Sequence, residues 1–284
     1  MKAFCYFLLY FLFATILGAL VAFPAYQLAD SGNYPFDSWV TRFSLLFLII
    51  GLFPLMKIHQ LSFRDIGYSL NFKEFSRSAG RGFINGLGIL LVVIGLLVIL
   101  DVRAFEDDAT LSANLLLAAL LSGVVVALIE ETLYRGVFFT VTERWNGTKF
   151  AVITSSFFYA IFHFIKPAQL IDPTTLHWLS GFEVILNAYL GVFELHYSDL
   201  LALLAVGLYL GLVRYKNGSL ATCIGLHASW VFLIKITKEL TDNNHQSTWR
   251  FLTGEYDGII GLLAASWLLV VSIHYALKTI RHKG

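Results

Sequence analysis

Charged side chains are scarce in this sequence of 284 residues: they make up 14% of the chain, whereas hydrophobic residues make up 57%. Soluble domains carry charge on about a quarter of their residues, and the mean hydropathy of +0.72 exceeds what a soluble chain carries without aggregating. The net charge is only +1, and no basic patch interleaved with aromatic residues appears, which argues against nucleic-acid binding. The composition therefore predicts an integral membrane protein.

Cysteine is the second scarcity. Cys5 and Cys223 are the only two, and both lie within apolar runs. Two such thiols indicate neither a disulfide framework nor a zinc-binding motif. Internal repeats, low-complexity tracts and long linkers are also missing, so we expect residues 1–284 to form a single transmembrane domain.

Long hydrophobic runs dominate what is present. A spanning helix needs about 20 mostly apolar residues, and this rule predicts eight spans, at residues 3–23, 39–56, 82–100, 112–140, 150–165, 196–213, 219–234 and 258–277. The apolar stretch at about 178–193 carries Glu183 and precedes Glu194, which favours an interfacial or re-entrant segment. The first run is too long for a signal peptide, so we interpret it as a retained helix. The expected fold is an all-α polytopic membrane protein.

The orientation follows from the Lys and Arg residues of the loops, which concentrate on the cytoplasmic side of membrane proteins. With the N-terminus inside, one side collects thirteen of them: Lys2, Lys57, Arg64, Lys73, Arg77, Arg81, Arg144, Lys149, Arg214, Lys216, Lys278, Arg281 and Lys283. The other side receives six: Arg42, Arg103, Lys166, Lys235, Lys238 and Arg250. Both termini are therefore expected in the cytoplasm. The segment 61–78 mixes charged and apolar residues and is either an amphipathic surface piece or a connecting loop.

Three polar clusters interrupt the expected spans, where charges are costly and need a partner or a function. In the first cluster, Glu131 and Arg135 are four residues apart, so they share a helix face and are expected to form an ion pair. Glu130 projects about 100° away around the helix. A carboxyl group left over in a low-dielectric site has a raised pKa, which suits a general base. The alternative is a purely structural Glu–Arg clasp.

The second cluster is His163, at the end of the fifth expected span. A single histidine on an apolar helix is often only a hydrogen-bonded core residue. The turn pair Asn146–Gly147 predicts an antiparallel hairpin between the fourth and fifth spans. In that hairpin Glu131 lies level with His163, and Arg135 lies level with Tyr159.

The third cluster is His227, about 12 Å into the seventh span by helical rise. By the same measure Glu131 lies about 18 Å and His163 about 20 Å from the ends of their helices. Half of the hydrocarbon core is about 15 Å thick. The clusters are therefore expected to meet near the middle of the membrane as one site.

In this order, the Glu130-Glu131-x-x-x-Arg135 motif, an aromatic-x-x-x-His motif ending at His163, and His227 resemble the CAAX-processing and bacteriocin-processing (CPBP, Abi) membrane proteases, or type II CAAX prenyl endopeptidase-like proteins. The resemblance covers roughly residues 112–234, and the Arg-Asp-Ile-Gly run at 64–67 resembles that family's upstream amphipathic stretch. It implies an intramembrane endopeptidase.

Two positions depart from the family pattern. Tyr159 stands where the second motif usually has Phe. Val231 stands where the last motif usually ends in Asn or Asp, a residue that is thought to help hold the tetrahedral oxyanion. Ser229 or Tyr159 are candidates to replace that donor.

The resemblance implies peptide hydrolysis by an activated water. We hypothesise that Glu130 is the general base and that His163 helps to place the water. Arg135 would hold Glu131 and set the charge balance, and His227 would donate to the oxyanion. This version needs no cofactor.

The alternative is a zinc ion bound by Glu131, His163 and His227, although the sequence has no His-Glu-x-x-His pair. It also lacks the Gly-x-Ser-Gly motif of rhomboid proteases, and Tyr256-Asp257 has no Gly-x-Gly-Asp partner of the presenilin type. A rival of another class is a non-enzymatic protein of the same fold: a bacteriocin self-immunity factor, a scaffold or a transporter.

The expected partners are the lipid bilayer and a peptide or protein with a hydrophobic or lipidated tail, processed as a CAAX end, a leader or a C-terminal sorting tail. The short loops and termini indicate a bacterial inner-membrane protein. The substrate itself is not encoded in any motif.

Overall fold

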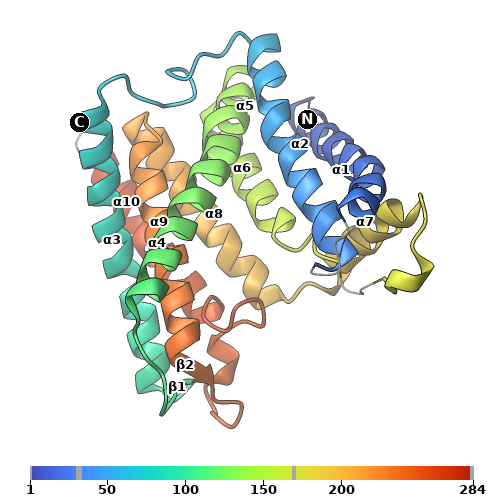
Figure 1. Ribbon diagram of the computed structural model, residues 1–284. Helices are drawn as coiled ribbons and strands as arrows, with labels where there is room; N and C mark the ends of the chain where they lie inside the picture. The colour runs from blue at the N-terminus through green and yellow to red at the C-terminus, as the bar shows by residue number, and fades with distance from the viewer. Residues whose placement is uncertain (1, 30–33, 168–170, 282–284) are drawn as a thin grey trace. The chain divides into compact units, whose positions relative to one another are not determined.

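Almost every segment of the computed structural model is helical (Figure 1), as the hydropathy pattern predicted. The structure describes residues 2–29, 34–167 and 171–281. Its contacts group the chain into two compact units. The first comprises Met1–Leu61, Arg144–Asn146 and Ile161–Leu195, and the second comprises Ser62–Glu143, Gly147–Ala160 and His196–Gly284. The expectation of a single domain stays a prediction.

The first unit is built on two long helices, α1 (Lys2–Leu28) and α2 (Phe36–Ile58), against which the shorter α7 (Ser180–Leu190) packs. A Cβ atom at Gly18 of α1 would lie 2.6 Å from the Ser44 backbone nitrogen of α2, so the glycine lets the two backbones approach closely. The Tyr10 hydroxyl also donates to the Leu48 carbonyl oxygen. Two 3₁₀ turns, Pro173–Thr175 and Gly191–Glu194, flank α7.

The stretch expected at about 178–193 is therefore an 11-residue helix followed by a 3₁₀ turn. This is too short to cross a bilayer. Whether it is interfacial or re-entrant stays a prediction.

The second unit carries most of the polar motifs. Its elements in chain order are α3 (Phe72–Ile99), β1 (Arg103–Phe105), α4 (Ala113–Glu131), a π-helical segment (Thr132–Phe138), α5 (Phe139–Asn146), α6 (Thr148–Phe162), α8 (Tyr197–Asn217), α9 (Ala221–Leu240), β2 (Thr241–Asn243), a 3₁₀ turn (Arg250–Leu252) and α10 (Leu262–Arg281). The last residues of α5 and α6 belong to the first unit. The short strands β1 and β2 pair antiparallel, with Ala104 opposite Asp242.

All eight expected spans coincide with helices. Within the described residues, five are long and apolar enough to cross a membrane by themselves: Lys2–Leu28, Phe36–Ile58, Phe72–Ile99, Ala113–Asn146 and Tyr197–Asn217. Thr148–Phe162 and Leu262–Lys278 are shorter apolar helices. The remaining span corresponds to α9, whose C-terminal turns carry Lys235, Lys238 and Glu239. The chain is thus an integral, multi-pass membrane protein, and its cytoplasmic termini and bacterial origin stay predictions.

Helix α9 packs closely on both α3 and α4, and glycines make this possible. A Cβ at Gly82 of α3 would lie 2.5 Å from the Thr222 carbonyl oxygen of α9. A Cβ at Gly123 of α4 would lie 2.5 Å from the Ala228 carbonyl oxygen. Small residues of this kind let membrane helices meet backbone to backbone. The packing presses the middle of α9, which carries His227, against the end of α4, which carries the two glutamates.

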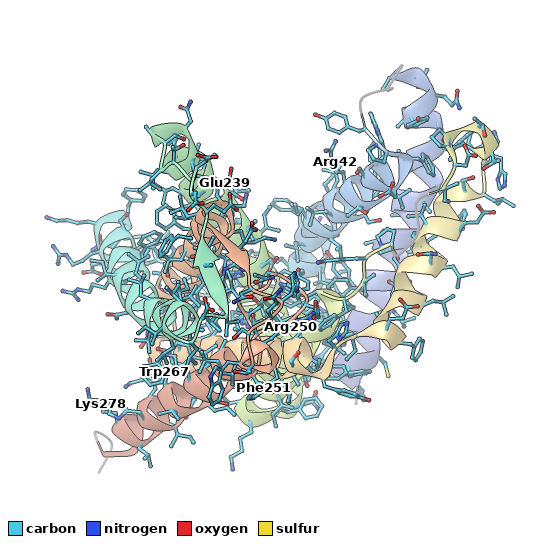
Figure 2. All side chains as sticks on the ribbon, turned by 90° about the horizontal axis from the view of Figure 1, so that it is seen from below. Arg42, Glu239, Arg250, Phe251, Trp267 and Lys278 are labelled. Carbon is cyan, nitrogen blue, oxygen red and sulfur yellow. The ribbon has the colours of Figure 1, made fainter. Side chains whose placement is uncertain are left out.

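The segment before α10 is fixed by polar contacts. The buried Arg103 side chain donates to Thr241 Oγ1 at 2.6 Å and to the Gly258 carbonyl oxygen at 3.0 Å. Figure 2 labels Arg250, which begins the 3₁₀ turn of this segment, and Trp267 on α10. The Trp267 indole N–H donates to the Ile89 carbonyl oxygen of α3 at 3.0 Å, which attaches α10 to the α3–α9 pair.

Candidate active site

The two glutamates of the first motif are the last residues of α4, directly before the π-helical segment. A π-helical turn holds one extra residue and occurs often at functional sites. Arg135 lies within it, and its Nη1 atom is 3.1 Å from Glu131 Oε1, with both side chains fully buried. The ion pair expected from the spacing is therefore present. Arg135 Nη2 also donates to the Gly207 carbonyl oxygen of α8 at 3.2 Å.

His227 joins this pair from α9. Its Nδ1 atom lies 2.8 Å from Glu131 Oε1, and its Nε2 atom lies 3.9 Å from Glu130 Oε2. A carboxylate accepts hydrogen bonds and does not donate them, so Nδ1 carries a proton that it donates to Glu131. The Nε2 atom is then the one that faces Glu130.

The two carboxylates have different environments. The Glu131 side chain is fully buried and held by Arg135 and His227. The Glu130 side chain is 26% exposed. Because one face of the helix carries the ion pair, the adjacent Glu130 projects to another side, as its position on the helix predicted. Glu130 is thus the more accessible of the two acids.

Tyr159 of α6 completes the cluster. Its ring lies under the Arg135 guanidinium, with 4.4 Å between Cζ and the ring centroid, and edge-on to the His227 ring at 5.9 Å. Arg135 and Tyr159 therefore lie at the same height on their helices, as the hairpin predicted. Gly147, at φ +83°, separates α5 from α6, as the expected turn requires.

Ser229 does not join the cluster. Its hydroxyl donates to the Leu226 carbonyl oxygen at 2.7 Å, and a Cβ at Gly86 of α3 would collide with it. Of the two candidate oxyanion donors, only Tyr159 contacts the His227 and Arg135 side chains.

His163 follows the last residue of α6 directly and belongs to the first unit. It is half-buried and takes part in polar or ring contacts of its own. Its expected alignment with Glu131 stays a prediction.

The sequence did not predict that Tyr134 and Tyr256 are neighbours of the site. The Tyr134 ring lies 5.5 Å from the Tyr159 ring, edge-on. Burial raises the pKa of the Tyr256 phenol, and the Glu130 carboxylate is the next largest cause of this rise, which places the phenol within electrostatic reach of Glu130. The buried Asp199 of α8 holds this loop by accepting from the Glu255 N–H at 3.2 Å. Asp199 could have been found from the sequence, because it is a carboxyl group within the apolar span expected at residues 196–213.

The zinc alternative requires three ligands at one point. Across residues 2–29, 34–167 and 171–281, no group of three His, Cys, Asp or Glu side chains is arranged to hold a metal ion. Glu131 Oε1, one of the expected ligand atoms, is instead engaged by the positive charge of Arg135. Glu131 Oε2, in contrast, has no hydrogen-bond partner among the described residues. The zinc alternative stays a prediction, and we derive no step through a metal.

The comparisons with known proteins agree with the motif order. Residues 112–233 match the family model described as type II CAAX prenyl endopeptidase Rce1-like. No curated protein and no solved structure matches the chain. The matched region contains the two glutamates, Arg135, His163 and His227, and it ends two residues beyond Val231. This match over residues 112–233 agrees with the family resemblance that the sequence motifs indicated.

Proposed function

We propose that the protein is an endopeptidase that hydrolyses a peptide bond near a hydrophobic or lipidated segment, with Glu130 as the base that activates water. The observation that carries this proposal is the difference between the two carboxylates. Glu131 is buried and neutralised by Arg135, whereas Glu130 is partly exposed beside His227 Nε2. Because the Glu131 side chain is fully buried, Glu130 is the acid that is better placed to reach a water molecule.

The position of His227 supports this assignment. Its Nδ1 atom lies 2.8 Å from Glu131 Oε1, so Nε2 is directed to the side of Glu130. The proposed mechanism requires a proton on Nε2 as well. The Nε2–H is a donor for an oxyanion, and such preorganised donors give about 10²–10³-fold in rate.

The reaction then runs in two steps. Glu130 takes a proton from the water, whose oxygen forms a bond to the scissile carbonyl carbon, while His227 Nε2–H stabilises the oxyanion. The C–N bond breaks as the protonated Glu130 returns its proton to the leaving amine. His163 helps to place the water, and the Tyr159 hydroxyl takes the place of the donor that the family usually has at position 231.

The substrate class follows from the family and from the membrane location. An acid that acts inside the bilayer meets polypeptide that enters from lipid, so the substrate carries a hydrophobic or lipidated tail. A prenylated CAAX end, a leader or a C-terminal sorting tail meets this condition.

A direct assay tests the proposal. The purified full-length protein is given a prenylated CAAX peptide and a matched peptide with an unmodified hydrophobic tail, and the release of C-terminal fragments is measured by mass spectrometry. In parallel, new peptide ends are compared in membranes that contain the wild type or Glu130→Gln. Glu239→Gln is the matched control, because it makes the same chemical change on an exposed turn of α9.

We expect Glu130→Gln to lower cleavage about 10²–10⁴-fold at unchanged protein level, and Glu239→Gln to behave as the wild type. If both variants support the same cellular function and neither changes any peptide end, the protein is non-enzymatic and the proposal is wrong.

A further inference from the structure

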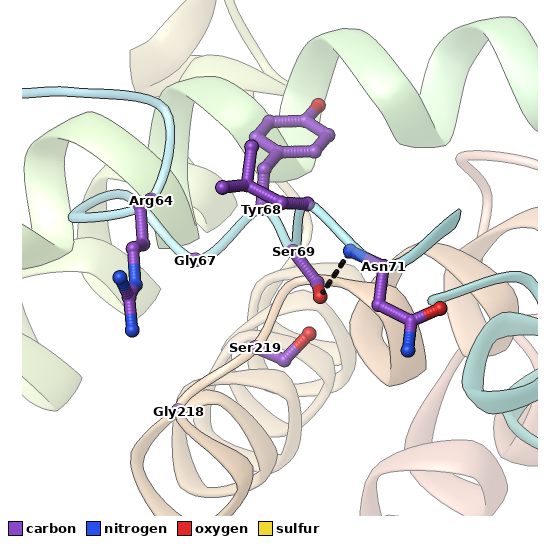
Figure 3. Close-up of a pocket in the computed structure, with 8 residues that line it drawn as sticks. Arg64, Gly67, Tyr68, Ser69, Asn71, Gly218 and Ser219 are labelled. Atoms are coloured by element: carbon purple, nitrogen blue, oxygen red, sulfur yellow. Dashed lines mark hydrogen bonds between the residues drawn. The ribbon is translucent and has the colours of Figure 1, made fainter. Parts of the chain in front are cut away.

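A cavity of about 430 Å³ opens in the second unit between the loop that precedes α3 and the loop that precedes α9. None of the residues of the candidate active site lines it. Figure 3 shows its lining, which consists of Arg64, Gly67, Tyr68, Ser69, Leu70, Asn71, Gly218 and Ser219. The polar side chains among them are all hydrogen-bond donors, and none of the lining residues is acidic. Such a wall is suited to an anion.

Three of the polar groups have protons available for a ligand. Ser69 Oγ accepts from the Asn71 N–H at 3.1 Å, and Ser219 Oγ accepts from the Ala221 N–H at 3.2 Å. Among the described residues neither hydroxyl donates to protein, so each O–H can turn to the cavity. Asn71 Oδ1 caps α3 by accepting from the Glu74 N–H, which leaves the amide NH₂ free to donate. The Tyr68 hydroxyl points the other way, to Thr132.

Arg64 supplies the charge. It is exposed, and within the part of the chain that the structure describes it makes no ion pair. The neighbouring Asp65 carboxylate accepts from the Ser62 N–H at 2.8 Å and from the Ser62 hydroxyl at 2.5 Å, and Asp65 does not line the cavity. A guanidinium presents a planar fork of N–H donors that matches two oxygens of a phosphate. A phosphate group is therefore the anion that this wall suits best.

The cavity wall is preformed. The Leu220 N–H donates to the Gly67 carbonyl oxygen at 2.9 Å and ties the two loops together. Gly67 and Gly218 have φ values of +102° and +63°, which a residue with a side chain rarely adopts. A ligand thus meets donors that are already in place, and less ordering opposes its binding.

The rim identifies the source of the phosphate. Leu70 is 92% exposed, Phe72 is 82% exposed and Phe63 is 56% exposed. Large apolar side chains beside a basic residue at the end of a spanning helix are typical of a segment that lies in the membrane interface. We infer that this cavity binds the phosphate of an anionic phospholipid, held by Arg64, Ser69 and Ser219, with the acyl chains along Leu70 and Phe72. The predicted cytoplasmic position of Arg64 agrees, because anionic lipids concentrate in that leaflet.

Lipid retention by the purified full-length protein tests this inference. The protein is exchanged into nanodiscs or mixed micelles of phosphatidylglycerol and phosphatidylcholine, and bound lipids are counted by native mass spectrometry. Arg64→Gln removes the charge at the cavity, and Arg77→Gln is the matched control, an exposed arginine on α3 that does not line it. Thermal unfolding of each variant establishes that it is folded.

We expect the wild type and Arg77→Gln to retain phosphatidylglycerol about tenfold better than phosphatidylcholine, which corresponds to one charge-assisted contact. Arg64→Gln loses this preference, and Ser219→Ala weakens it. Equal retention by Arg64→Gln and Arg77→Gln overturns the inference. If excess inorganic phosphate stabilises the wild type but not Arg64→Gln while phosphatidylglycerol has no effect, the site binds a soluble phosphate and the lipid assignment is wrong.

Discussion

The His227 Nδ1 atom lies 2.8 Å from Glu131 Oε1, although 96 positions separate the two residues in the chain. The same carboxylate oxygen lies 3.1 Å from Arg135 Nη1. This shared oxygen couples the two motifs: it holds one imidazole nitrogen and thereby sets the direction of the other. In the proposed mechanism Glu131 and Arg135 are positioning residues, and Glu130 and His227 act on the substrate.

Removing the positive charge of the buried pair is expected to destabilise the protein. Arg135→Met leaves the Glu131 carboxylate buried without its ion-pair partner, which costs about 3–5 kcal/mol. The double variant Glu131→Gln/Arg135→Met removes both charges and is expected to recover most of this loss. Unfolding followed by circular dichroism in detergent measures both effects, with Arg77→Met as the exposed control. Equal stability of Arg135→Met and Arg77→Met would contradict this prediction.

Two replacements of His227 separate its two nitrogens. In His227→Asn the side-chain amide N–H occupies the place of Nδ1–H, so the bond to Glu131 is kept while the group at Nε2 is lost. We expect stability within about 1 kcal/mol of the wild type and cleavage lowered about 10²–10³-fold. In His227→Ala both bonds are lost, and stability falls as well. Peptide cleavage and thermal unfolding are measured on the same preparations, and normal cleavage by His227→Asn would contradict an oxyanion role for Nε2.

Local spacing was sufficient to predict part of this site. The four-residue interval between Glu131 and Arg135 predicted their ion pair because helix geometry alone places them on one face. The turn at Gly147 predicted that Tyr159 lies opposite Arg135, because residues equally far from the turn of an antiparallel hairpin face each other. Hydropathy predicted the helices themselves, because each must satisfy its backbone internally in lipid.

Other features depend on contacts that no local pattern encodes. The π-helical segment from Thr132 to Phe138 has no signature in composition. The 2.8 Å contact of His227 with Glu131 requires α9 to lie close to α4, which depends on glycines such as Gly123 meeting the α9 backbone. The position of Tyr256 depends on Asp199, 57 residues earlier in the chain, which fixes its loop. Tertiary packing decides these three features.

The missing polar residue at position 231 predicts a contrast between Tyr159 and Ser229. Tyr159→Phe keeps the ring against Arg135 and His227 and removes only the hydroxyl, so we expect stability to be maintained and cleavage to fall about 10²-fold. Ser229→Ala loses a bond to the Leu226 carbonyl oxygen, worth about 1 kcal/mol, and is expected to cleave normally. Steady-state cleavage by both variants is the measurement. A larger loss in Ser229→Ala than in Tyr159→Phe would reverse the assignment.

Metal removal is expected to leave cleavage unchanged. Arg135 Nη1 lies 3.1 Å from Glu131 Oε1, and its permanent positive charge disfavours a second cation beside this carboxylate. The measurement compares cleavage before and after dialysis against 1,10-phenanthroline, with and without added zinc, and determines bound metal by mass spectrometry in the purified protein. The Arg135→Met variant sharpens the test, because it removes the repelling charge and is expected to bind zinc more tightly than the wild type. Loss of wild-type cleavage with the chelator, restored by about one equivalent of zinc, would contradict water activation by Glu130 alone.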